Sequence, residues 1–338
     1  MKEHVIVEPS DLAQWAHPPG TQAPAAPPQN LAWPEAGGAS GVVVLRGARP
    51  WLRDWIISWC ELTKARLTLL VLFTTSIGFG LGTAGAADWA GMSRVLMGTA
   101  LVAGAAAALN QYREREWDAR MRRTEHRPLP AGRLQPLTAY WFGMVSSLAG
   151  LVYLAWAVNP LTSLLGAITL GNYLLVYTPL KRITPWNTLV GAVSGAMPIL
   201  MGWTAARGEL SRAGWVLFAI LYLWQMPHFF AIAWLYRADY ARAGFAMLSV
   251  NDPSGRRTGR HSLFYAMVLV PVSLAPFFLG LTGPGYLGAA VGLGSAWIWL
   301  AGRFAGRPDE RRAQGLFLYS LLYQPLLLVW MLMDRVKL

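Results

Sequence analysis

Long apolar runs separated by short polar loops dominate the chain from about residue 67 onward. Most runs approach the roughly 20 residues that a helix needs to cross the hydrocarbon layer of a bilayer. Several contain glycine or proline, which are commoner in membrane helices than in soluble ones. The pattern predicts an all-α, polytopic membrane protein with nine transmembrane helices, near residues 67–83, 93–109, 139–158, 161–177, 189–204, 214–236, 263–280, 285–301 and 316–332.

Composition supports a membrane protein and divides the chain into two parts. Of 338 residues, 54% are hydrophobic and 14% charged, which is too apolar for an ordinary soluble protein. Residues 1–42 are rich in proline, alanine and glycine, so we expect a disordered tail there and the membrane domain over 43–338. The net charge of +12 raises the possibility of nucleic-acid binding. Because the charge is spread over short loops, we expect no nucleic-acid partner.

The loops that follow alternate runs carry most of the Arg and Lys residues, as does the segment before the first run. The positive-inside rule places these loops and the N-terminus in the cytoplasm and the C-terminus in the periplasm. The N-terminal residues resemble neither a secretory signal nor a mitochondrial transit peptide, which favours a bacterial inner membrane.

The most informative segment, residues 110–130, follows the second run and is densely charged. In a helix, Asn110, Glu114 and Asp118 recur every four residues, so one amide and two carboxylates share a face. Mg²⁺ binds one or two carboxylates together with substrate phosphates, and the neighbouring arginines would offset the charge of a polyanion. The alternative is an ordinary solvated loop. Acidic residues occur here in a loop where the positive-inside rule favours Arg and Lys, and this favours a catalytic site over an ordinary loop.

Two further loops carry candidate residues. Lys181 and Arg182 follow the fourth run and suit phosphate oxygens, although membrane topology explains them equally well. His228 lies inside the sixth run, where a polar ring is costly unless it is hydrogen-bonded or used, so a structural histidine and a ligand both stay open. Asp239 follows the sixth run as Asp118 follows the second, which suggests acidic sites that face each other.

Five motifs follow in order along the chain, in or close to its apolar runs: Lys64-x-Arg66, Asn110-x-x-x-Glu114-x-x-x-Asp118 with Arg123-Thr124 and Arg127-Pro128-Leu129, Leu180-Lys181-Arg182-x-Thr184-Pro185-x-Asn187, Trp224-Gln225-x-Pro227-His228-Phe229, and Asp239-Tyr240-x-x-Ala243-Gly244. Together they resemble the UbiA superfamily of intramembrane prenyltransferases, and within it the protohaem IX farnesyltransferase branch. The resemblance covers about residues 55–335. Two positions depart from the branch pattern, Ala65 and Ala246, and both shape the backbone more than the chemistry.

The resemblance implies transfer of the farnesyl group of farnesyl diphosphate to a vinyl group of haem B, with addition of water, to give haem O and diphosphate. It implies haem A synthase as a partner that receives the product, and the lipid bilayer as the setting. It also assigns roles to residues: Mg²⁺ at Glu114, Asp118 and Asp239 with help from Asn110; diphosphate at Lys64, Arg66, Arg123, Arg127, Lys181 and Arg182; and the haem side at His228, Trp224 and Tyr240.

Two other functions stay open at this point. The nearer one is a related prenyltransferase with an aromatic quinone-precursor acceptor, whose second acidic cluster usually holds several aspartates, whereas Asp239 stands alone here. The other is a secondary transporter, whose sites lie at the bilayer midplane on broken helices. The acidic residues here fall at helix ends, which suits a diphosphate that arrives from the cytoplasm.

Overall fold

The structure is a computed structural model that describes residues 50–336, with side chains from residue 52 onward. The predicted disordered tail, residues 1–42, lies outside the described residues. Within 50–336 the chain is helical, and one isolated bridge joins Thr282 to Arg335 near the C-terminus. The helices are α1 (Pro50–Leu62), α2 (Ala65–Gly82), α3 (Trp89–Asp118), α4 (Pro136–Ala157), α5 (Pro160–Gly171), the π-helix η2 (Asn172–Tyr177), α6 (Thr178–Leu180), α7 (Asn187–Arg207), α8 (Arg212–Leu235), α9 (Arg237–Arg242), α10 (Arg256–Phe278), α11 (Pro284–Gly306) and α12 (Glu310–Met333).

The nine predicted runs correspond to α2, α3, α4, the continuous segment α5–η2–α6, α7, α8, α10, α11 and α12. Eight of these segments are long and apolar enough to cross a membrane. The ninth, α11, has 23 residues, six of which are glycine. The all-α, multi-pass membrane fold is therefore confirmed. The short helices α1 and α9 were not predicted, because neither approaches spanning length.

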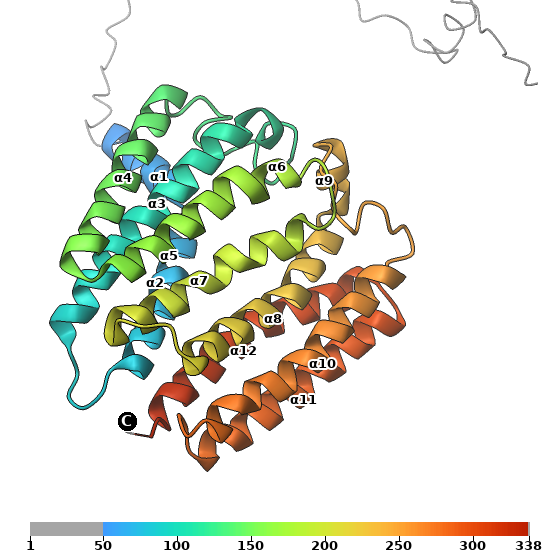
Figure 1. The fold of residues 1–338 in the computed structure, drawn as a ribbon. Helices are drawn as coiled ribbons and strands as arrows, with labels where there is room; N and C mark the ends of the chain where they lie inside the picture. The colour runs from blue at the N-terminus through green and yellow to red at the C-terminus, as the bar shows by residue number, and fades with distance from the viewer. Residues whose placement is uncertain (1–49, 337–338) are drawn as a thin grey trace, which may run out of the picture. The chain divides into compact units, whose positions relative to one another are not determined.

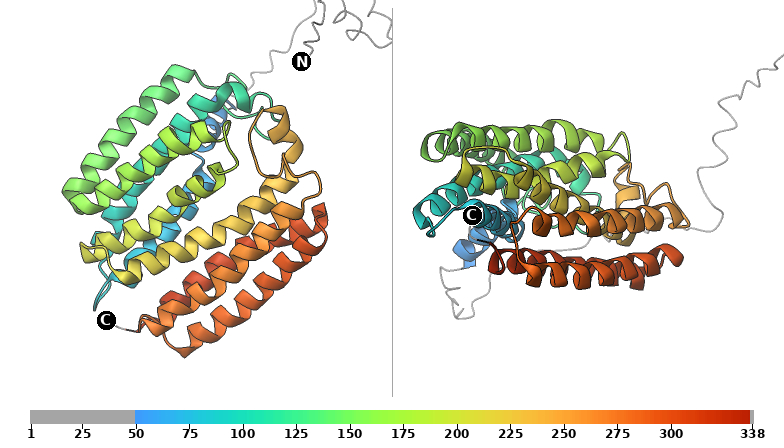
Figure 2. Two further views of the ribbon diagram at one scale, coloured as in Figure 1. Left: turned by 45° about the vertical axis from the view of Figure 1, so that its right-hand side comes forward. Right: turned by 60° about the horizontal axis from the view of Figure 1, so that its bottom comes forward.

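Four of the long helices, α2, α7, α8 and α12, contact one another in a closed ring. Helix α2 contacts α3 and α7, α8 contacts α7, α10 and α12, and α12 returns to α2. The helices α3 to α5 and the helices α10 and α11 lie on opposite sides of α7 and α8 (Figures 1 and 2). The loops after α3, α6 and α8 gather at one end of the bundle, where α9 also lies (Figure 1).

Two glycines set the distance between α2 and α7. A Cβ built on Gly78 would lie 2.0 Å from the carbonyl oxygen of Ile199, and one on Gly202 would lie 2.0 Å from the carbonyl oxygen of Thr75. Small residues allow this close approach of helix backbones, which membrane helices use because lipid offers no hydrophobic driving force between them. Neither residue can carry a side chain unless the two helices separate.

We expect Gly202→Ala to reduce the thermal stability of the purified protein by about 1–3 kcal/mol or more, because its Cβ would overlap a backbone oxygen that cannot rotate away. The matched control is Gly292→Ala on α11, where a Cβ meets nothing within 4 Å. The control should unfold at or slightly above the wild-type temperature. Equal melting temperatures for both variants would contradict the role of Gly202.

Candidate active site

A cavity of about 440 Å³ lies between α2, α3, α7 and α8, and its walls are mostly apolar. One end is different, because charged and polar side chains from α3 and the loops beyond it line it. Of the predicted site residues, those that line the cavity are Lys64, Asn110, Glu114, Asp118, Arg123, Arg127, Lys181, Trp224, His228 and Tyr240. Residues from all five sequence motifs therefore meet at one cavity.

The last two turns of α3 form the charged wall. Asn110, Glu114 and Asp118 lie on one helical face, and their exposed fractions are 1%, 5% and 0%. The amide Nδ2 of Asn110 donates a hydrogen bond of 2.9 Å to Oε2 of Glu114. The spacing of four residues thus produces the shared face that the sequence predicted.

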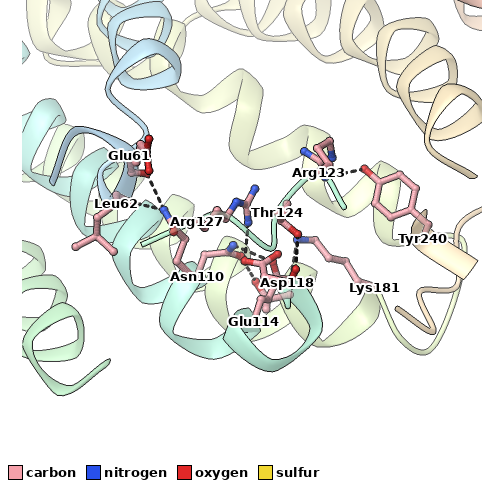
Figure 3. A network of polar contacts seen from close by, with 12 residues as sticks. Glu61, Leu62, Asn110, Glu114, Asp118, Arg123, Thr124, Arg127, Lys181 and Tyr240 are labelled. Carbon is pink, nitrogen blue, oxygen red and sulfur yellow. Dashed lines mark hydrogen bonds and ion pairs between the residues drawn. The ribbon is translucent and has the colours of Figure 1, made fainter. Parts of the chain in front are cut away.

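Lys181 neutralises Glu114. Its Nζ donates to Oε1 of Glu114 at 2.7 Å, and both side chains are buried. Burial alone would lower the pKa of Lys181, but the Glu114 carboxylate outweighs this and raises that pKa above its usual value. The hydroxyl of Thr178 shares its hydrogen between the carbonyl oxygen of Tyr173, at 2.8 Å, and Oδ1 of Asn110, at 3.1 Å, which adds a second link between α3 and α6. Figure 3 shows Lys181 reaching Glu114 across the gap between these segments.

Arg127 neutralises Asp118 in a similar way. Its Nη1 donates to Oδ2 of Asp118 at 2.6 Å, and the hydroxyl of Thr124 donates to the backbone oxygen of Asp118 at 2.8 Å. These bonds fold the loop after α3 back over the end of its own helix (Figure 3). The other carboxylate oxygen, Oδ1 of Asp118, is buried and has no hydrogen-bond partner among the described residues. It is therefore free to accept a ligand.

Lys64 enters the site from the turn between α1 and α2. Its backbone is left-handed, with φ 48° and ψ 52°, a conformation that residues other than glycine seldom adopt. Gln111 on α3 fixes the end of α1, because its Nε2 donates to the carbonyl oxygens of Glu61 and Leu62 at 2.8 Å each. Burial, and then the positive charges of Arg127 and Lys181, lower the pKa of Lys64 to about 7. Lys64 is thus the one lysine of the site whose charge changes near neutral pH.

Three residues of the site, Tyr173, Tyr177 and Thr178, were not predicted from the sequence. The two tyrosines line the cavity, and Nζ of Lys181 lies 4.5 Å from the ring centroid of Tyr177. They belong to the π-helix η2, whose wider turn shifts the residues after it relative to an α-helix. The guanidinium of Arg113 donates to the carbonyl oxygen of Leu174 inside this segment. The feature of the sequence that could have identified them is the pair of tyrosines, four residues apart, at the end of an apolar run.

Three predicted residues do not line the cavity. Arg66 is exposed, and Arg182 is exposed with its guanidinium 4.4 Å from the ring centroid of Trp117. Asp239 lies on α9 and forms an ion pair with Arg242 on the same helix. In the part of the chain that the structure describes, no three His, Cys, Asp or Glu side chains are close enough to hold a metal ion. The predicted set of Glu114, Asp118 and Asp239 is therefore not assembled, because α9 holds the third carboxylate away from the other two.

Although Asp239 lies outside the cavity, the next residue on α9 contacts the loop after α3. Nη2 of Arg123 contacts the hydroxyl of Tyr240, the residue next to Asp239, at 3.5 Å. His228 and Trp224, from deeper in α8, line the apolar part. The cavity therefore combines an end rich in cations and carboxylates with an apolar interior that one histidine enters.

A model of the UbiA prenyltransferase family matches residues 71–323, which is most of the chain. The chain belongs to the UbiA prenyltransferase family. A relative from Solibacter usitatus, named "Protoheme IX farnesyltransferase", is 47% identical over 293 residues, which are 84% of this chain and 99% of the relative. The mitochondrial protein of that name from Homo sapiens is 41% identical over 80% of this chain and 61% of its own length.

Solved structures of UbiA proteins share the fold at low sequence identity. A structure reported for a digeranylgeranylglyceryl phosphate synthase matches with a TM-score of 0.72 and 17% identity, over 84% of this chain and 99% of that one. A UbiA homologue from Archaeoglobus fulgidus bound to GPP and Mg²⁺ has a TM-score of 0.58 and 14% identity, over 81% and 99%. The family and fold inferred from the sequence motifs are thereby confirmed, and the transporter alternative loses its support.

We expect Lys181→Met to destabilise this prenyltransferase by about 3–5 kcal/mol, because the buried Glu114 carboxylate would lose its counter-charge. The double variant Lys181→Met with Glu114→Gln should recover much of that stability, since no unpaired charge is left. Thermal unfolding of the purified protein measures both. A double variant no more stable than Lys181→Met would contradict the pairing.

Proposed function

We propose that this enzyme transfers the farnesyl group of farnesyl diphosphate to a vinyl group of haem B, with addition of water, to give haem O and diphosphate. The observation that carries the proposal is the cavity itself, where four cationic side chains at one end adjoin an apolar interior that contains His228. The names of relatives that align along nearly their full length support the same reaction.

The cationic end suits the departure of diphosphate. Ionisation of an allylic diphosphate leaves a carbocation and an anion, so the site must stabilise negative charge as the bond breaks. Lys64, Arg123, Arg127 and Lys181 all line this end of the cavity. Hydrogen bonds from these groups to the leaving oxygens would be strong, since both partners are charged.

The carboxylates fit a hard divalent cation, for which we propose Mg²⁺. Glu114 and Asp118 offer oxygens one helical turn apart, and Oδ1 of Asp118 is buried without a partner among residues 50–336. Mg²⁺ usually takes one or two carboxylates and completes its shell with phosphate and water, and when bound it supplies Lewis acidity at the leaving group. The Archaeoglobus fulgidus homologue, solved with GPP and Mg²⁺, supports this choice. Asp239 would join as a third ligand once it separates from Arg242.

The apolar walls suit the farnesyl chain and the cation derived from it. Burial of fifteen carbons contributes on the order of 10 kcal/mol before the costs of association, at about 0.8 kcal/mol per methylene. The same walls keep water from the carbocation until the vinyl carbon forms the new carbon–carbon bond. Water then adds to the adjacent cationic carbon and releases a proton. The ring faces of Tyr173 and Tyr177 would stabilise positive charge near the diphosphate end.

The setting follows from the charge distribution. We place the protein in a bacterial inner membrane with the cationic end of the cavity facing the cytoplasm, because the arginine-rich loops lie there by the positive-inside rule. Farnesyl diphosphate would enter from the cytoplasm with its chain in the bilayer. Haem O would pass to haem A synthase.

The direct test incubates purified protein with Mg²⁺, farnesyl diphosphate and haem B and analyses the products by mass spectrometry. We expect haem O, and we expect Glu114→Gln and Asp118→Asn to lower its formation at least a hundredfold per folded molecule, counted that way because each change leaves a cation without its carboxylate. A prenylated quinone precursor, formed in place of haem O when an aromatic acceptor is supplied, would overturn the proposal. Wild-type turnover in either variant would reject the role of these carboxylates.

We expect the affinity for a non-ionising farnesyl diphosphate analogue to fall as pH rises above 7. Lys64 has a pKa lowered to about 7, its protonated form attracts the anion, and deprotonation above that pH removes the attraction. The loss should be about tenfold per pH unit until the pKa of the complex is reached. Isothermal titration at several pH values measures it. Lys64→Arg, which stays charged, should flatten this dependence, and an unchanged pH profile in that variant would assign the titration to another group.

A further inference from the structure

His228 lies well inside the bundle and away from the charged end of the cavity. It is seven residues before Leu235, the last residue of α8, which is about 10 Å at the helical rise of roughly 1.5 Å per residue. Its ring stacks on that of Trp224, with ring centroids 5.3 Å apart and an angle of 24° between the planes. The ring centroid of Phe317 on α12 lies 5.2 Å from that of His228. These two rings hold the imidazole in one orientation.

Ser320 on α12 decides which nitrogen of that imidazole carries the hydrogen. Its Oγ lies 2.6 Å from Nδ1 of His228 and also contacts the backbone carbonyl oxygen of Phe317. The carbonyl can only accept, so the single hydroxyl hydrogen of Ser320 goes to it. The hydrogen in the contact with His228 must then come from the ring, and Nδ1 is the protonated nitrogen. Ser320 is completely buried, so no solvent competes for this arrangement.

The other nitrogen, Nε2, therefore presents a lone pair. It has no hydrogen-bond partner among residues 50–336, and the half-buried His228 side chain lines the cavity. A histidine that ligates a metal usually donates its second ring N–H to a fixed acceptor, which sets the tautomer and the ring orientation. His228 and Ser320 show this arrangement within the cavity that we assign to haem and farnesyl diphosphate.

We infer that Nε2 of His228 is the axial ligand of the haem iron in the substrate complex, and that Ser320 is the positioning residue that keeps Nε2 unprotonated and aimed into the cavity. The inference rests on the proposed function, since it concerns the acceptor substrate. An iron–imidazole bond fixes the height and tilt of the porphyrin against α8. The vinyl group that reacts is then held at a constant distance from the diphosphate end of the cavity.

This inference is tested by binding measurements with two ligands that differ only in the presence of iron. The probes are ferric haem B and iron-free protoporphyrin IX, titrated into the full chain in detergent or nanodiscs. We expect the wild type to bind haem at least tenfold more tightly than the iron-free porphyrin and to show a histidine-ligated spectrum, with an iron–histidine stretch in the resonance Raman spectrum of the reduced complex. In His228→Ala the two affinities should become equal and the stretch should disappear, and added imidazole should restore the spectrum.

Two further variants separate ligation and positioning from general damage. Ser320→Ala should weaken haem binding by about 10- to 100-fold with a shifted iron–histidine stretch, as loss of a group behind a metal ligand commonly does. It should leave binding of the iron-free porphyrin unchanged. Ser320→Ala therefore keeps the inference testable even if His228→Ala fails to fold. The matched control is His261→Ala on α10, a histidine that does not line the cavity, and it should behave as wild type.

The outcomes distinguish this inference from the proposed function. A wild-type enzyme that makes haem O but prefers haem no more than iron-free porphyrin would overturn the axial ligand and leave the reaction standing. Persistence of the histidine signature in His228→Ala would overturn it too. An unchanged haem affinity and stretch in Ser320→Ala would remove the positioning role. Absence of haem O from the wild-type assay would reject the proposed function itself.

Discussion

The ion pair between Glu114 and Lys181 is the interaction on which the charged end of the cavity depends. It joins the last turns of α3 to the segment after α6, and both side chains are buried. Removal of water from two charges costs several kcal/mol each, and this cost is recovered only when the geometry is good and the remaining polar atoms are paired. Asn110 and Thr178 supply that pairing. Gln111 and Asp118, also on α3, hold the segments that carry Lys64 and Arg127.

The sequence predicted the parts of this arrangement that follow a helical period. Nine apolar runs became nine long helical segments, and the four-residue spacing of Asn110, Glu114 and Asp118 became a buried face. The sequence did not predict η2, because a π-helix has no distinct pattern of apolar residues and its wider turn depends on tertiary contacts such as that between Arg113 and Leu174. Tyr173 and Tyr177 were missed for the same reason.

Loop residues were predicted less well, because charge alone does not say which way a side chain points. Lys181 and Arg182 are adjacent and chemically alike, yet Lys181 enters the cavity and Arg182 stacks on Trp117 at the surface. Asp239 was expected to face Asp118, but Arg242 on the same short helix holds its carboxylate instead. Local ion pairs three residues apart compete with a distant site, and the sequence alone cannot weigh the two.

Glu114 and Asp118 on α3 are each paired with a cation that also suits a diphosphate. Glu114 holds Lys181 and Asp118 holds Arg127, so both carboxylates are compensated before any substrate arrives. Under the proposed function, Glu114 and Asp118 would hold the metal ion, and Lys181 and Arg127 would turn from these carboxylates to the phosphate oxygens. Such an exchange would leave each of these four charges with a partner, which neither a metal ion alone nor a diphosphate alone could do. The pairing of the four side chains therefore supports joint binding of the metal ion and the diphosphate.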